Sequence, residues 1–193
     1  MKLTALMTAL LVALFAAPMF AQESTREDFR ELCQLVQGRW VGDVTWVADW
    51  PGFGKRGEKV TAYTENKIAE DGNALISRFY GGDGSSTGLI VFDAGAEQIK
   101  SFGVSSGGGV GQSIMYKKGG KWVDEGTGSN PDGTKTRGTA TLTITDNGNT
   151  HTWTGPTWVG EKRVDDAKDV FRRVSKCVLS AGLKNPRTRE ATP

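Results

Sequence analysis

The sequence predicts a mainly β protein: a single antiparallel up-and-down β-barrel of about ten strands with a short N-terminal helix. From Arg39 to Ser175, apolar and polar residues alternate over short runs, which is the period of a β-strand. The turns between these runs are rich in glycine, asparagine and aspartate and too short for crossover helices, so neighbouring strands should pair antiparallel. An open meander would expose two edges, so closure into a barrel is expected.

Residues 1–21 are expected to form a secretory signal peptide outside the fold. Lys2 precedes an apolar run from Leu3 to Ala17, and Ala21 offers a cleavage site. The run is shorter than the roughly 20 residues of a transmembrane helix, so no membrane span is expected after cleavage. Met19 is larger than the small residue preferred there, which leaves an uncleaved anchor as the alternative. The prediction is a secreted or periplasmic protein.

The rest of the chain should form one domain. Residues 22–37 form the helical segment, 38–180 the barrel and 181–193 a flexible tail. The whole chain carries 24 basic and 22 acidic residues, and loss of the leader removes only Lys2. Such a near-neutral chain gives no electrostatic reason to expect a nucleic acid or an anionic membrane as partner. Its oligomeric state leaves no mark in the sequence.

The helix is predicted from about Ser24 to Gln37. Ser24 and Glu27 have the spacing of a capping box, and Gly38 supplies a stop. One face carries apolar residues at helical spacing: Phe29, Leu32, Cys33 and Val36. This stripe needs an apolar surface to cover, and one end of a barrel provides it.

Ten runs with a period of two follow the helix. They are Trp40–Val47, Lys59–Ile68, Ala74–Tyr80, Thr87–Asp93, Gln98–Ser105, Gln112–Lys117, Lys121–Gly128, Thr134–Thr145, Thr150–Val159 and Asp169–Val178. Asp165, Asp166 and Asp169 precede or open the last run and are expected to form a solvated turn.

The two cysteines, Cys33 and Cys177, lie near opposite ends of the chain. In an oxidising compartment such a pair is expected to form a disulfide. The alternative is two small buried apolar side chains. No histidine or second cysteine lies near either in sequence, so neither is expected to be catalytic.

The first strand opens with Gly38, Trp40 and Gly42, after a short helix, and the last strand carries Arg172 and Arg173. This arrangement resembles the calycins, the group of lipocalins and fatty-acid-binding proteins. The resemblance implies that Trp40 plugs the barrel floor and that Arg172 or Arg173 packs across its ring. The mature chain also resembles secreted bacterial lipocalin-like domains of unknown function, and its opening is similar to that of nitrobindin-like haem barrels.

Small barrels can enclose one apolar ligand. Several aromatic residues are candidates to line a pocket, although they could also simply fill the interior: Trp46, Trp122 and Trp153. Arg78 could meet a ligand carboxylate beside Tyr80 if both face inward. If Leu75, Ser77 and Phe79 face inward instead, Arg78 lies in solvent, and strand register decides between the two.

The segment that joins the first two strands carries two large rings, Trp50 and Phe53. It is a candidate lid over the barrel mouth. The alternative is that both rings pack over the barrel end as ordinary core.

His151 is the only histidine, so no histidine cluster exists for a zinc site. One imidazole suffices for a haem, and the nitrobindin-like opening makes His151 its candidate ligand. No other cofactor is expected.

The sequence therefore predicts a secreted barrel that binds a small apolar or amphipathic molecule without transforming it. The second hypothesis is a cyclase- or isomerase-type barrel enzyme, for which His151, Glu65, Asp124 or Arg78 would have to converge in the pocket. The third is a structural or partner-binding module whose interior is packed solid by tryptophans.

Overall fold

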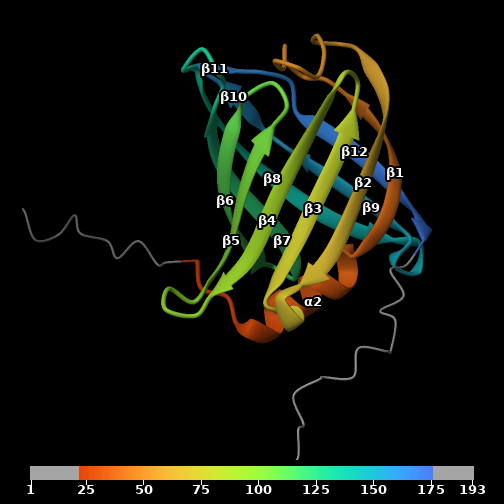
Figure 1. Cartoon of the computed structure of the whole chain (residues 1–193), viewed down its shortest axis with the longest axis vertical. Coiled ribbons are helices and arrows are strands. Elements are labelled where there is room, and N and C mark those ends of the chain that lie inside the picture. The colour runs from red at the N-terminus through yellow and green to blue at the C-terminus, as the bar shows by residue number, and fades with distance from the viewer. Residues whose placement is uncertain (1–21, 176–193) are drawn as a thin grey trace, which may run out of the picture.

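The computed structural model describes residues 22–175, which form a closed antiparallel barrel of ten strands with one α-helix at its end (Figure 1). The barrel strands are β1 (Gly38–Thr45), β2 (Lys59–Ala69), β3 (Ala74–Gly81), β4 (Gly84–Asp93), β5 (Gln98–Ser105), β6 (Val110–Lys118), β7 (Lys121–Ser129), β8 (Lys135–Thr145), β9 (Thr150–Gly155) and β12 (Ala167–Ser175). Each pairs with its neighbours in chain order, and the pairing of β12 with both β9 and β1 closes the ring. The predicted fold class is thus confirmed.

The ninth predicted strand is interrupted in the structure. β9 ends at Gly155, and after Pro156 the chain continues along β8 as β10 (Thr157–Val159), which pairs with β11 (Lys162–Arg163). A Cβ atom at Gly155 would lie 1.8 Å from the carbonyl oxygen of Thr139, so only glycine fits there. Pro156 has no N–H to donate to a neighbouring strand, so the ladder is interrupted at Gly155 and Pro156.

Two 3₁₀ turns with similar sequences connect strands at one end of the barrel. They are η1 (Glu70–Gly72), between β2 and β3, and η2 (Asp146–Gly148), between β8 and β9. Both contain a central residue with positive φ followed by a glycine with positive φ. Asparagine and aspartate tolerate this conformation and glycine favours it, so these local residues determine the turns.

The helix α2 (Arg26–Val36) begins two residues after the predicted start at Ser24, and its cap is shifted by one residue. Its N-cap is Thr25, whose hydroxyl accepts a hydrogen bond from the Asp28 N–H, while Asp28 accepts one from the Thr25 N–H. The predicted box of Ser24 and Glu27 is therefore wrong by one position. The Ser24 hydroxyl is buried and donates instead to the Met115 carbonyl, 3.1 Å away, which ties the start of the helix to β6.

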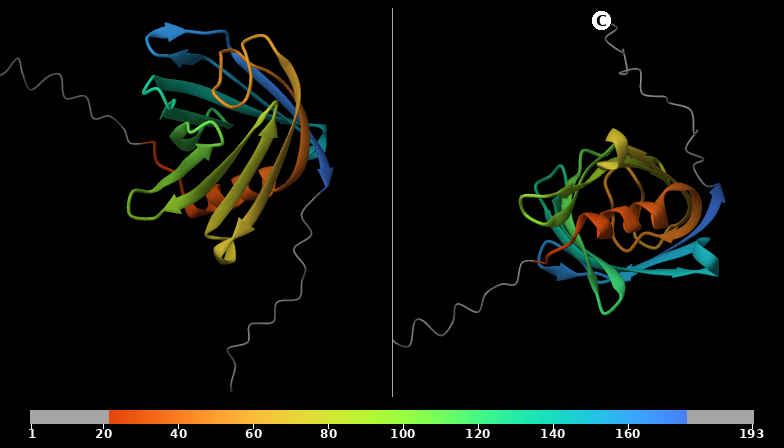
Figure 2. Two further views of the ribbon diagram at one scale, coloured as in Figure 1. Left: turned by 45° about the horizontal axis from the view of Figure 1, so that its top comes forward. Right: turned by 90° about the horizontal axis from the view of Figure 1, so that it is seen from below.

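α2 lies across one end of the barrel and closes it (Figure 2). Its predicted apolar face is buried against a core that includes Leu75, Ile99, Met115 and Leu142. In the part of the chain from 22 to 175, no helix is long and apolar enough to cross a bilayer.

Trp40 is almost fully buried in the core, and its indole N–H donates to the Val36 carbonyl of α2. Of the two arginines considered, Arg173 is the one that covers it, with its guanidinium carbon 3.9 Å from the ring centroid. Arg172 points outward, where it pairs with Asp43. Gly38 adopts a positive φ as the first residue of β1 and follows Gln37, the C-cap of the helix.

Cys33 is buried on the inner face of α2. Burial raises the pKa of its thiol to about 12, so it is not a reactive thiolate. Cys177 lies outside the described residues, as do the predicted signal peptide and tail. The disulfide therefore stays a prediction.

Candidate functional site

Strand register determines which side chains face the barrel interior. In β5, Ile99 is fully buried in the core, so Ser101, Gly103 and Ser105 share its inward face. Phe102 and Val104 between them are 45% and 53% exposed on the outer surface. The ladders between β2 and β8 run without a register shift, so the same alternation continues around the barrel.

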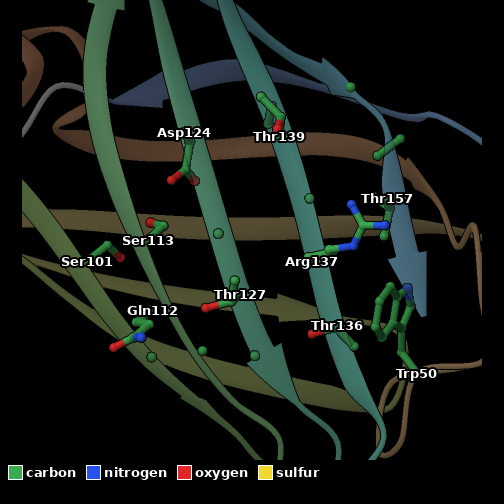
Figure 3. Close-up of a pocket in the computed structure, with 18 residues that line it drawn as sticks. Trp50, Ser101, Gln112, Ser113, Asp124, Thr127, Thr136, Arg137, Thr139 and Thr157 are labelled. Atoms are coloured by element: carbon green, nitrogen blue, oxygen red, sulfur yellow. The ribbon is translucent and has the colours of Figure 1, made fainter. Parts of the chain in front are cut away.

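The interior contains a central cavity of about 440 Å³ along β5 to β8 (Figure 3). Apart from Asp124 and Thr136, the inward side chains of this wall are small: Ser101, Gly103, Gly111, Ser113, Gly126, Gly128, Gly138 and Ala140. Trp50, from the loop between β1 and β2, also lines it. The interior is therefore not packed solid by Trp46, Trp122 and Trp153, which is the packing that the third hypothesis requires.

Several glycines of this wall are not required by the backbone. Gly103, Gly111 and Gly126 have no positive φ, and a Cβ atom built on each would meet its nearest neighbour at 3.4 Å or more, which is ordinary contact. Glycine inside a strand weakens the strand. Gly103 and Gly111 are exposed to solvent although they face inward. Their missing side chains leave the space that forms the cavity.

The opposite wall is aromatic. Phe79 lies between Phe53 and Phe171, with ring centroids 5.9 and 6.5 Å away, and Trp46 packs 5.6 Å from Phe53. A mouth cavity of about 220 Å³ lies under these rings, and a deep cavity of about 250 Å³ lies between Phe79 and α2. The two cavities share Phe79, and Trp50 lines both the mouth and the central cavity.

The loop over residues 46–58 lies at the end of the barrel opposite α2 (Figure 1). It rests on the turn between β5 and β6, where a Cβ atom at Gly107 would lie 1.9 Å from the Pro51 carbonyl oxygen. Arg56 fastens its far side to Asp165 with an N–O distance of 2.6 Å. The loop thus places Trp50 and Phe53 over the cavities.

Asp124 is the acidic residue that lines the central cavity. It projects inward from β7, and its Oδ1 atom is buried without a hydrogen-bond partner. Burial raises the pKa of this carboxyl, and a hydrogen bond from Ser113 offsets part of the rise. Figure 3 shows Asp124 and Ser113 side by side on neighbouring strands.

Asp169 is a second inward acid, and it lines the deep cavity beside Trp153. Burial raises its pKa to about 6. The expectation that it belongs to a solvated turn is therefore wrong. It shares the inward face of β12 with Ala167, Phe171 and Arg173, and this alternation was the signal in the sequence that could have placed it.

His151 lines the deep cavity, packed 4.1 Å from the Trp40 ring and 5.3 Å from Phe171. The indole N–H of Trp153 donates to its Nδ1 atom at 3.0 Å, so the ring proton belongs on Nε2. Nε2 then has no lone pair for iron, and His151 does not fit as a haem ligand in this arrangement. Burial, with the Arg173 charge, lowers its pKa to about 4, so it is neutral at pH 7.

Three predicted ligand-binding residues lie elsewhere. Arg78 and Tyr80 face solvent on β3, because the buried Leu75 places Ser77 and Phe79 on the inner face. Trp122 is buried in the core at the helix end, beneath Lys117, and does not line these cavities. The other five predicted residues, namely Trp46, Trp50, Phe53, His151 and Trp153, do line interior cavities.

The groups proposed for proton transfer do not converge. Glu65 faces outward and pairs with Arg39 and Lys67, and Arg78 is also outside. Asp124 and His151 face inward but line different cavities. In the part of the chain that the structure describes, no group of three potential metal ligands is present.

Comparison with protein-family models and with curated proteins found no match to this chain. The closed ten-stranded barrel with one short helix is consistent with a calycin-like fold. The closer resemblance to lipocalins or to nitrobindin-like barrels stays a prediction.

Proposed function

We propose that this protein binds one small apolar or amphipathic molecule inside its barrel. The observation that carries the proposal is the central cavity, whose wall contains glycines at positions where the backbone accepts a larger residue. Side chains there would add buried contacts and strengthen the strands. A protein that leaves this space empty loses stability, and such losses are typical of functional sites.

Three unpartnered polar atoms support the same function. Among the described residues, the buried side-chain atoms without a hydrogen-bond partner are Trp46 Nε1, Asp124 Oδ1 and His151 Nε2. Each belongs to a residue that lines one of the three interior cavities. An unsatisfied buried polar atom costs about 1–3 kcal/mol, so a ligand or water in these cavities would offset a real penalty.

The aromatic wall and the loop define the entrance. A ligand entering past Trp50 and Phe53 would lie between the aromatic side and the glycine side of the barrel. Ligand cavities of about 300–1,000 Å³ with aromatic walls and a few polar groups are typical of small-molecule sites. The predicted secretion stays part of this proposal, because the leader lies outside the described residues.

Two neighbouring positions of β5 provide the test. Gly103→Leu fills the cavity from inside, and Phe102→Ser removes an apolar side chain from the outer surface. The neutral probe N-phenylnaphthylamine should bind wild type at one site, bind Phe102→Ser equally, and bind Gly103→Leu at least about tenfold more weakly. Thermal unfolding checks that each variant is folded. Loss of binding in Phe102→Ser with retention in Gly103→Leu would place the probe outside the barrel and overturn the proposal.

A further inference from the structure

The polar corner of the central cavity indicates which end of a ligand it receives. Asp124 on β7 and Ser113 on β6 lie side by side, and Ser101 on β5 is the cross-strand partner of Ser113 (Figure 3). The three groups offer one carboxylate and two hydroxyl oxygens as acceptors. Apart from Thr136, four residues along β8 from the Asp124 partner Ala140, the rest of the inward wall of β5 to β8 is glycine and alanine, so Asp124, Ser113 and Ser101 form one polar corner.

No cation of the described chain neutralises Asp124. The inward cations are at the helix end: Lys117 pairs with Asp28 and Glu31, and Arg173 is hydrogen-bonded to main-chain carbonyls. Arg137 also lines the cavity, but it alternates with the inward Gly138 on β8, and its guanidinium carbon lies 4.2 Å from the Trp158 ring centroid. Figure 3 shows it directed away from Asp124.

We infer that the ligand is a cationic amphiphile, whose protonated amine binds Asp124 and whose apolar part lies against the glycine wall. An ammonium group carries three N–H donors, which match the three acceptors of this corner. It would satisfy the unpartnered Oδ1 atom through a charge-assisted hydrogen bond. The inference rests on the proposed function, because it assigns the chemistry of the same site.

The same corner disfavours anionic ligands. A carboxylate would face Asp124, whose Oδ1 atom is buried, and the deep cavity adds Asp169 as a second inward acid. Like charges at close range repel, and the repulsion is stronger beside a buried carboxylate oxygen than between two charges in water. A fatty acid therefore does not suit this interior. Arg78, the predicted partner of a ligand carboxylate, faces solvent.

Burial of Asp124 is consistent with this role. Desolvation raises the pKa of the Asp124 carboxyl, and an adjacent ammonium group would lower it again by stabilising the carboxylate. The cavity thus interacts most favourably with a ligand that brings its own positive charge.

The test uses three molecules with one tail: decylamine, decanol and decanoate. Calorimetric titration at pH 7 should show that wild type binds decylamine at least about tenfold more tightly than decanoate, with decanol between them. Asp124→Asn should remove the preference and keep decanol binding, whereas Asp124→Glu should retain the preference. Glu125→Gln, next along β7 and exposed, is the matched control and should behave as wild type.

The outcomes separate this inference from the proposed function. Binding of decanol with equal affinities for amine and carboxylate would refute the cationic ligand and leave the container intact. Tighter binding of decanoate, or a preference unchanged in a folded Asp124→Asn, would also refute it. Failure of all three molecules to bind wild type would count against the proposed function itself.

Discussion

The inward charged residues beside the cavities of this barrel are acidic, whereas a site for a fatty acid needs an inward cation. The basic candidate, Arg78, faces solvent, and the inward charged groups beside the cavities are Asp124 and Asp169. Neither acid is compensated by an ion pair that the structure shows within residues 22–175. A buried carboxyl without a counter-charge destabilises the fold when it ionises.

This cost predicts how stability depends on pH. The pKa of Asp169 is about 6 in the folded protein and near 3.8 when the group is exposed. As the pH rises from about 4 to about 6, the unfolded chain loses its proton first, so the free energy of unfolding falls. Two pKa units correspond to about 3 kcal/mol, an upper figure for a group that is not fully buried.

Asp169→Asn should remove this loss. The variant and wild type should have similar unfolding free energies near pH 4, and the variant should be about 2–3 kcal/mol more stable at pH 7. His151, whose pKa is lowered to about 4, contributes stability that is lost as the pH falls from about 6.5 to 4. This contribution is common to both proteins and cancels in the difference. Urea denaturation between pH 4 and pH 7 measures the difference in unfolding free energy between Asp169→Asn and wild type. Asp43→Asn, at an exposed position, is the control. A difference that does not grow as the pH rises would show that Asp169 is not a destabilising buried carboxylate.

Among the elements, α2 needs side chains of the barrel as hydrogen-bond donors to the carbonyls at its C-terminal end. The last carbonyls of a helix have no partner within it, and α2 has no basic residue in its last turn. Trp40 Nε1 and Asn66 Nδ2 both donate to the Val36 carbonyl, at 2.9 and 2.8 Å. Arg173 donates to the carbonyls of Leu35 and Gln37. The barrel therefore caps the helix that closes it.

Arg173 connects α2, η2 and β12. Besides the helix carbonyls, it donates to the Gly148 carbonyl at 3.0 Å and stacks on Trp40. Arg173→Ala should lower the free energy of unfolding by about 2–4 kcal/mol, because three partly buried carbonyls lose a charged donor and the cation–π contact is lost.

Arg172→Ala is the matched control, since Arg172 is the preceding residue and forms an exposed pair with Asp43. It should change stability by no more than about 0.5 kcal/mol. Equal effects of the two substitutions in chemical denaturation would show that Arg173 does not organise the helix end.

The positions of the strands and turns could be predicted from the sequence, because they depend on residues that are close together in the chain. Alternation located all ten barrel strands, and turn residues such as Gly72 and Gly148 marked their ends. The interruption at Gly155 was missed, since it depends on close approach of the Thr139 main chain on another strand. The helix cap was misplaced because Ser24 and Thr25 are both good caps, and only the contact of Ser24 with Met115 distinguishes them.

For the whole molecule, the closed barrel could be predicted but its interior could not. Alternation leaves two faces to choose between, and a shift by one residue exchanges them, as with Arg78 and Phe79. Glycines at turns and glycines on the cavity wall look alike in sequence. Gly103 and Gly126 became informative only when the structure showed ordinary backbone angles and room for a side chain.

The central claim is that the barrel is a container occupied by one small molecule. Native mass spectrometry of the protein, purified from the cells that produce it naturally, tests it most directly. We predict a mass above that of the chain by one small molecule, which denaturation releases and whose tandem spectrum reveals an amine. The bare chain mass, both as purified and after incubation with millimolar decylamine and decanol, would contradict the claim.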